Sequence, residues 1–160
     1  MKIRVGYGYD SHRCAEGRRL ILGGVEFPGE IGLKGHSDAD VLAHAVIDAI
    51  FGAAALGNIG SHFPDTDERW RGADSMDLLA RAVALVREQG WTIGNLDATV
   101  ICERPRLAPK IDAIRDRLAT VMGVERAAVS VKGKTNEKMD DVGGGLGIIA
   151  HAVCLLEQLG

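Results

Sequence analysis

The stretch HSDADVLAHAVIDAI, residues 36–50, marks where the chain changes from short extended segments to a helix. From Asp38 onward the apolar residues recur at intervals of three and four, which is the spacing of one helical face. Ser37 or Asp38 suits the N-cap position, and acidic residues are favourable in the first turn of a helix. We therefore predict a helix that begins near Asp38 and ends near Gly57.

Shorter runs on either side of this helix predict the remaining elements. β-Prone residues bounded by Gly or Pro predict strands at residues 2–9, 20–27, 96–103 and 128–132. Helices are predicted at 75–89 and 107–122, a polar loop at 61–72, and either a strand or a short helix at 148–156. This order predicts one α+β domain over residues 1–160, with a small mixed sheet and helices packed on one face. The other face needs cover, for which oligomerisation through the sheets is one hypothesis.

Composition limits the classes of function. Of 160 residues, 46% are hydrophobic and 26% charged, as in an ordinary globular domain. The net charge of −3 offers no basic surface for nucleic acid. No apolar run approaches the roughly 18 residues of a membrane span. A strand follows Met1 almost directly, so we expect no leader peptide and a cytoplasmic protein. Cys14, Cys102 and Cys154 are widely spaced, which favours reduced, inert thiols over disulfides.

Three side chains form a candidate metal site. Asp10 and His12 lie two residues apart in an extended segment and therefore point to the same side. His44 lies on the predicted helix, and two imidazoles with one carboxylate are a common zinc set that leaves a fourth position open. Asp48, one turn after His44, can accept the second ring N–H of His44 and so set its tautomer. Spacing alone equally allows separate surface groups.

Three polar clusters are candidates for binding phosphate groups. His36, just before the helix, can donate a hydrogen bond to a phosphate, although helix capping alone explains its acidic neighbours. Residues 63–67 form an Asp-rich turn with one Pro, a common structural feature. Residues 132–138 combine a hydroxyl, a carboxylate and three cations, which suit a diphosphate with Mg²⁺ or a solvated turn. The phosphate-loop, dinucleotide-binding, HExxH and GxSxG patterns are all missing.

Together these segments resemble the family of 2-C-methyl-D-erythritol 2,4-cyclodiphosphate synthases, nearly from end to end. The resemblance is carried by five ordered motifs: Gly8–His12, His36–Asp40 with His44 and Asp48, Gly52–Gly57, Phe63–Asp67, and Thr135–Lys138.

The resemblance implies a metal-dependent phosphorus–oxygen lyase of the non-mevalonate isoprenoid pathway. It implies conversion of 4-diphosphocytidyl-2-C-methyl-D-erythritol 2-phosphate to 2-C-methyl-D-erythritol 2,4-cyclodiphosphate and CMP, by intramolecular attack of the 2-phosphate on the β-phosphate. Zinc would be held by Asp10, His12 and His44, and a Mg²⁺ or Mn²⁺ ion by Glu137 and the substrate. The implied assembly is a homotrimer with active sites between subunits.

The resemblance also implies roles for individual residues. His36 and Thr135 would act as catalytic donors to phosphate. The cytidine diphosphate portion would be received by Cys102, Glu103, Arg104, Pro105, Arg106, Leu107, Ala108, Lys134, Thr135, Asn136 and Glu137. The methylerythritol phosphate portion would be received by His36, Ser37, Phe63, Pro64, Asp65, Thr66 and Asp67. Further substrate contacts are implied for Asp10, His12, Asn58, Ile59 and Gly60.

The chain departs from the family pattern at several positions. Asn58 stands where the family often has Asp, and Lys134 where it often has Thr. Many relatives carry an aromatic residue, an Arg and a Glu along the segment matching 141–146, lining a cavity on the trimer axis that can hold an isoprenoid diphosphate. Asp141, Gly144 and Leu146 supply none of these groups, so we expect no Arg-based anion site there.

Two other functions remain open from sequence. A zinc hydrolase acting on a phosphorylated metabolite would use the same three ligands to activate water and would give an acyclic phosphate. A trimeric metal- or isoprenoid-binding module would show no turnover.

Overall fold

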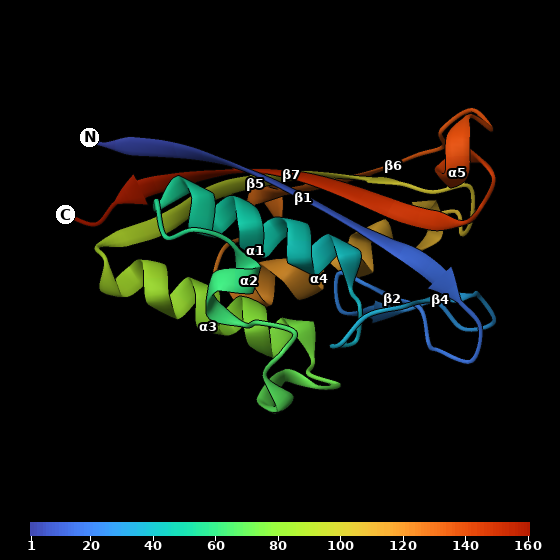
Figure 1. Cartoon of the computed structure of the whole chain (residues 1–160). Helices are drawn as coiled ribbons and strands as arrows, with labels where there is room; N and C mark the ends of the chain where they lie inside the picture. The colour runs from blue at the N-terminus through green and yellow to red at the C-terminus, as the bar shows by residue number, and fades with distance from the viewer.

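A five-stranded mixed sheet forms one layer of the fold (Figure 1). The computed structural model describes residues 1–160. The strands lie in the order β4-β1-β7-β5-β6, and only β5 and β6 pair in parallel. Their bounds are β1 Ile3–Ala15, β4 Gly32–Leu33, β5 Trp91–Ile101, β6 Val129–Lys134 and β7 Gly147–Gln158. A separate small hairpin pairs β2 (Ile21–Leu22) with β3 (Val25–Glu26).

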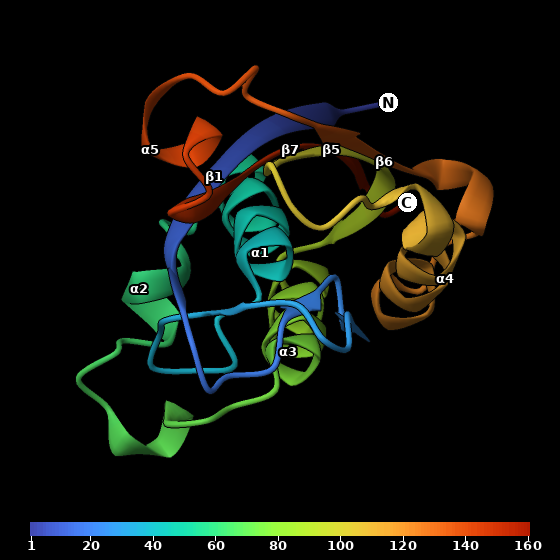
Figure 2. The same cartoon turned by 90° about the vertical axis from the view of Figure 1, so that its right-hand side faces the viewer.

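Three longer helices cover one face of this sheet, which arches over them in the end-on view (Figure 2). They are α1 Val41–Ala53, α3 Ser75–Glu88 and α4 Ile111–Met122. The short elements are α2 Ile59–His62, α5 Asp140–Gly143 and the 3₁₀ turns η1 Glu68–Trp70, η2 Ala108–Lys110 and η3 Arg126–Ala128. No helix has both the length and the apolar character needed to cross a membrane. The predicted α+β domain with helices on one face is confirmed.

The central helix α1 packs directly on the backbone of β1. Eleven of its thirteen residues are buried, because the sheet lies on one side of it and α3 on the other. Gly6 and Gly8 of β1 make this possible: a Cβ atom at Gly6 would lie 1.9 Å from the Ala49 carbonyl oxygen, and one at Gly8 would lie 1.8 Å from that of Ala45. The seam between β1 and α1 therefore fixes the helix closely against the strand that carries Asp10.

The opposite face of the sheet is open in the single chain and carries exposed apolar side chains on β1 and β7. On β1 every second residue points away from the helices, and these include Ile3, Val5, Tyr7 and Tyr9, each more than 40% exposed. Val153 of the neighbouring strand pairs with Tyr7 and is 44% exposed. Exposed apolar side chains gathered on one sheet face are typical of surfaces that contact another protein.

Several predicted boundaries are wrong for local reasons. The strand predicted at 20–27 is a hairpin, because Gly23 and Gly24 take positive φ values of 60° and 75° and turn the chain. The helix predicted to reach Gly57 ends at Ala53, since Ala55 has φ 58°. The helix predicted at 107–122 starts only at Ile111, after the turn η2.

The predicted N-cap of α1 is also wrong. Asp40, not Ser37 or Asp38, caps the helix by accepting from Ala43 N at 3.0 Å. Its carboxylate also accepts from the backbone N–H groups of Gly23 and Gly24. The carboxylate thereby ties the β2–β3 hairpin to the start of α1. The segment at 148–156, for which two interpretations were open, is part of strand β7.

Candidate metal centre and substrate cavities

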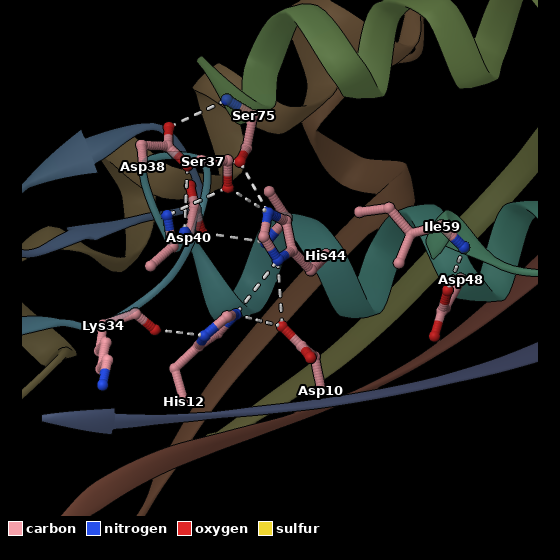
Figure 3. A network of polar contacts seen from close by, with 12 residues as sticks. Asp10, His12, Lys34, Ser37, Asp38, Asp40, His44, Asp48, Ile59 and Ser75 are labelled. Carbon is pink, nitrogen blue, oxygen red and sulfur yellow. Dashed lines mark hydrogen bonds and ion pairs between the residues drawn. The ribbon is translucent and has the colours of Figure 1, made fainter. Parts of the chain in front are cut away.

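Asp10, His12 and His44 converge on one point between β1 and α1 (Figure 3). His12 Nε2 lies 2.8 Å from Asp10 Oδ2, and His44 Nδ1 lies 3.1 Å from the same oxygen. The two ring nitrogens are 3.3 Å apart. Asp10 and His12 share the helix-facing side of β1, as their two-residue spacing predicted, and the close packing of α1 brings His44 to them.

The donors around this point suit a metal ion. His12 Nδ1 lies 2.8 Å from the Lys34 carbonyl oxygen, which can only accept, so Nδ1 carries the proton of the neutral ring and Nε2 presents a lone pair. This lone pair faces a carboxylate oxygen and the inner nitrogen of His44. Three electron-rich atoms this close together repel one another unless a proton or a cation lies among them. One carboxylate and two imidazoles match the ligands of an open zinc site.

The pKa values of two ligands reflect this need for positive charge. Burial opposes ionisation of Asp10, but hydrogen bonds from His12 and His44 outweigh it and lower the pKa of Asp10 to about 2. Burial likewise disfavours the charged ring of His12, yet the hydrogen bond and charge of Asp10 raise the pKa of His12 above its usual 6.5. With Asp10 ionised and both rings neutral, the cluster carries a net negative charge, which a bound cation would offset.

The outer nitrogen of His44 does not contact Asp48. His44 Nε2 lies 2.9 Å from Ser75 Oγ and 3.2 Å from Ser37 Oγ. The Asp48 carboxylate instead accepts from Ile59 N at 2.8 Å. The predicted bond from His44 to Asp48 is therefore wrong. Asp48 does lie one helical turn from His44, but the backbone N–H at the start of α2 is a competing donor for its carboxylate.

A cavity of about 360 Å³ opens beside the three ligands. It is lined by Asp10, His12, Gly35, His36, Ser37, His44, Ile59, Gly60, Phe63, Pro64, Asp65, Trp70 and Leu78. Most of the residues expected to receive the methylerythritol phosphate portion are among them. Trp70 and Leu78 were not predicted, and the Trp70 indole nitrogen is buried without a hydrogen-bond partner. A Trp at the end of a polar loop was the only signal in the sequence.

Three residues expected to contact the substrate, Asn58, Thr66 and Asp67, do not line this cavity. Asn58 caps α2 by accepting from Ser61 N at 3.0 Å. Asp67 caps η1 and pairs with Arg69, whose hydrogen bonds lower the pKa of the Asp67 carboxyl. Thr66 is likewise not among the lining residues. The side chains of Asn58 and Asp67 therefore shape the loop around the cavity.

A second cavity of about 210 Å³ contains most residues expected to receive the cytidine diphosphate portion. Its lining comprises Cys102, Glu103, Pro105, Arg106, Leu107, Ala108, Ile111, Gly133, Lys134 and Thr135. Arg104 lies outside this lining and pairs with Glu30 at 3.3 Å. Asn136 and Glu137 also lie outside it.

Glu103 has a structural contact that the sequence did not predict. Its carboxylate accepts from Asn136 N at 3.2 Å and from Lys138 N at 3.1 Å. These bonds hold the turn around Glu137, which has a positive φ of 51° and an exposed side chain. Glu103 therefore presents the predicted second metal ligand to solvent.

The two cavities share no lining residue within one chain. His36 and the three metal ligands line the first, while Thr135 lines the second. Most of the predicted site residues thus fall into two separate groups, one in each cavity, which are called half-sites below.

These features define a small α+β domain with a candidate Asp/His/His metal-binding triad beside a cavity. The YgbB family profile matches residues 3–157, and the chain belongs to this family. It is 55% identical over 158 residues to a protein of Thermosynechococcus vestitus named 2-C-methyl-D-erythritol 2,4-cyclodiphosphate synthase, covering 99% of this chain and 98% of that one.

Solved structures agree with this membership. The bifunctional IspDF of Campylobacter jejuni matches with a TM-score of 0.96 at 39% identity, over 99% of this chain and 43% of that chain. IspF of Plasmodium falciparum in complex with CDP matches with a TM-score of 0.86 at 33% identity, over 99% of this chain and 97% of that one.

Proposed function

We propose that this chain is a cytoplasmic phosphorus–oxygen lyase that converts 4-diphosphocytidyl-2-C-methyl-D-erythritol 2-phosphate to 2-C-methyl-D-erythritol 2,4-cyclodiphosphate and CMP. An oxygen of the 2-phosphate forms a bond to the β-phosphorus. The bond from that phosphorus to the CMP oxygen breaks, and CMP leaves with the electron pair. The observation that carries the proposal is the convergence of three lone pairs beside a cavity lined by His36 and Ser37. The names of the relatives support the substrate.

Asp10, His12 and His44 would hold zinc, and Glu137 would hold Mg²⁺ or Mn²⁺. Bound there, these cations would supply positive charge that reduces repulsion between the two phosphates. Phosphoryl transfer needs little covalent help, so positioning and charge stabilisation carry most of the catalysis. A phosphate monoester is already ionised near neutral pH, with a second pKa of about 6, so no general base is required.

His36 and Thr135 are the proposed donors to phosphate. His36 Nε2 donates to the Asp67 carbonyl oxygen at 3.0 Å, which leaves Nδ1 for a ligand. Because both ring nitrogens then donate, this role requires the imidazolium form of His36. Thr135 Oγ1 accepts from Glu137 N at 3.3 Å, so its hydroxyl proton remains free for a phosphate oxygen.

We also propose that the enzyme works as a homotrimer. A substrate that contacts both His36 and Thr135 must span two half-sites that share no residue within one chain. Association through the apolar face of the sheet would cover Val5, Tyr7 and Val153 and bring half-sites of different subunits together. Asp141, Gly144 and Leu146 would provide no guanidinium for an isoprenoid diphosphate on the trimer axis.

Phosphorus NMR of the products tests this function. Purified protein with zinc, Mg²⁺ and the CDP-linked substrate should give CMP and a cyclic diphosphate with two coupled phosphorus signals. An acyclic phosphate would indicate the hydrolase instead. A protein that binds zinc but releases no CMP would indicate a binding module.

A further inference from the structure

The outer side of His44 is held by a buried hydrogen-bonded chain that ends in a carboxylate (Figure 3). His44 Nε2 lies 2.9 Å from Ser75 Oγ, and the Ser75 hydroxyl donates a hydrogen bond to Asp38 Oδ1. The backbone N–H of Ser75 donates to the other oxygen of Asp38 at 2.9 Å. Ser75 is 0% exposed and His44 is 8% exposed, so their contact is shielded from water, while Asp38 at the end of the chain is half-buried.

We propose that Asp38 and Ser75 are positioning residues for the metal centre, which set the tautomer of His44 and strengthen its Nδ1 as a ligand. This inference rests on the proposed metal site. Neither residue would touch the metal or the substrate; both would act through His44.

The direction of each hydrogen bond follows from the available protons. Asp38 accepts from Asp40 N at 3.1 Å in addition to both groups of Ser75, so every contact of its carboxylate is with a donor. The hydroxyl proton of Ser75 is therefore committed to Asp38, and the Ser75 oxygen can only accept from His44. Nε2 of His44 must carry the ring proton, which leaves the lone pair on Nδ1, the atom 3.1 Å from Asp10.

The two imidazoles of the site are consequently supported differently. His12 donates to a neutral carbonyl of Lys34, whereas His44 donates to a hydroxyl polarised by a carboxylate. A carboxylate behind a ligating histidine fixes the ring and raises its basicity, and loss of such support costs about 10- to 100-fold in metal affinity. Removing the outer partner of His44 should therefore weaken metal binding more than removing that of His12.

Ser37 offers an internal comparison at the same ring nitrogen. Its Oγ lies 3.2 Å from His44 Nε2 and accepts from Ala39 N at 3.2 Å, but no carboxylate contacts it. If a nearby hydroxyl were sufficient, Ser37 and Ser75 would contribute equally. The carboxylate makes Ser75 the dominant partner.

Backbone hydrogen bonds also hold Ser75 in place on the side that faces the substrate cavity. Gly72 N donates to the His36 carbonyl oxygen at 2.8 Å, and Asp38 N donates to that of Ala73 at 3.0 Å. These bonds pair the segment around His36 with the residues leading into α3, whose N-cap is Asp74. Ser75 is thus fixed relative to His44 by the same backbone that lines the substrate cavity.

Zinc affinity, measured by competition with a chromophoric chelator, tests the proposal without reference to turnover. Ser75→Ala should raise the zinc dissociation constant at least 10-fold, and Asp38→Asn should raise it several-fold, whereas Ser37→Ala should stay within about 3-fold of wild type. The double variant with Ser75→Ala and Asp38→Asn should bind zinc no more than about 2-fold more weakly than Ser75→Ala, because the two residues act through one bond.

Two further readouts separate positioning from structural damage. Thermal unfolding of the metal-free variants identifies the temperature range in which each is folded, and affinities are compared there. In ¹⁵N-labelled, zinc-loaded protein the His44 Nε2–H signal should be protected from water exchange in the wild type and exposed in Ser75→Ala. If Ser75→Ala does not fold, the zinc affinity of Asp38→Asn and the exchange of its His44 Nε2–H signal test the proposal instead.

Wild-type affinity in Ser75→Ala, equal losses in Ser75→Ala and Ser37→Ala, or additive losses in the double variant would each overturn the proposal. A wild-type protein that binds no zinc would instead refute the metal site itself.

Discussion

Replacing Gly8 by Ala adds one methyl group to the seam between β1 and α1. The new Cβ would lie 1.8 Å from the Ala45 carbonyl oxygen and 2.7 Å from Ala49 N. Ordinary contact begins at 3.4 Å, so the helix and the strand must separate by about 1.6 Å (3.4 minus 1.8). Both atoms belong to the backbone of a buried helix, so no side chain can rotate away to relieve the clash.

This separation should cost both stability and metal binding. Overpacking of a well-packed core costs about 1–3 kcal/mol, and we expect the upper end because the clash is with backbone. His44 directly precedes Ala45, so the same shift moves its Nδ1 away from Asp10. Zinc bonds are about 2 Å long and tolerate little change, so zinc affinity should fall at least 10-fold.

Gly52→Ala is the matched control, since it adds the same methyl group to the other side of the seam. Its Cβ would meet only the Tyr7 carbonyl oxygen, at 3.7 Å. Ala is favoured over Gly in a helix, so this variant should gain about 0.5 kcal/mol. Urea denaturation of the metal-free proteins and chelator competition measure both effects. If Gly8→Ala unfolds within about 0.5 kcal/mol of Gly52→Ala and binds zinc equally well, the close seam does not position the ligands.

Three further predictions concern the site and the thiols. His44→Ala should lose zinc and nearly all turnover while the proposed trimer persists, as judged by metal analysis, product assay and light scattering. An active, zinc-replete variant would contradict the assignment. The raised pKa of His12 predicts that the metal-free protein is stabilised below pH 6.5 and loses that stability as the pH rises through the folded-state pKa. The zinc-loaded protein should lack this loss of stability. Parallel pH profiles of unfolding for the two forms would refute this prediction. Burial raises the pKa of Cys102 to about 11 and that of Cys154 to about 12, so at pH 8 a disulfide reagent should modify Cys14 first, and early labelling of either buried thiol would show that the core opens.

The candidate metal triad could be predicted in part from local periodicity, although spacing alone left separate surface groups open and the family resemblance decided between them. Alternation in a strand puts Asp10 and His12 on one side, and the helical pattern around His44 is unambiguous. The contact between the strand and the helix is a tertiary interaction, which local periodicity does not predict. Gly6 and Gly8 were visible only as small residues in a strand, and their purpose becomes clear only when α1 lies against them.

The support of His44 could not be predicted, because competing partners decide it. Asp48 is one turn from His44, but Ile59 N is a donor that also needs an acceptor, and it takes the Asp48 carboxylate. Ser75 follows Asp74 just before an apolar run, where both residue types favour a helix N-terminus. A helix start is a sufficient reason for a Ser at this position in the sequence, whereas in the structure its buried hydroxyl contacts His44, a residue 31 positions away.

Two independent constraints act on the same imidazole, and they should be separable by experiment. The seam at Gly8 fixes where His44 lies, through the backbone of α1, and belongs to the core of the domain. The link through Ser75 and Asp38 fixes which nitrogen carries the ring proton, and involves few core contacts. A change at Gly8 should therefore lower the free energy of unfolding and zinc affinity together, whereas a change at Asp38 should lower zinc affinity with little change in the unfolding of the metal-free protein. Variants that lowered both quantities in the same proportion would show that a single packing constraint governs the whole site.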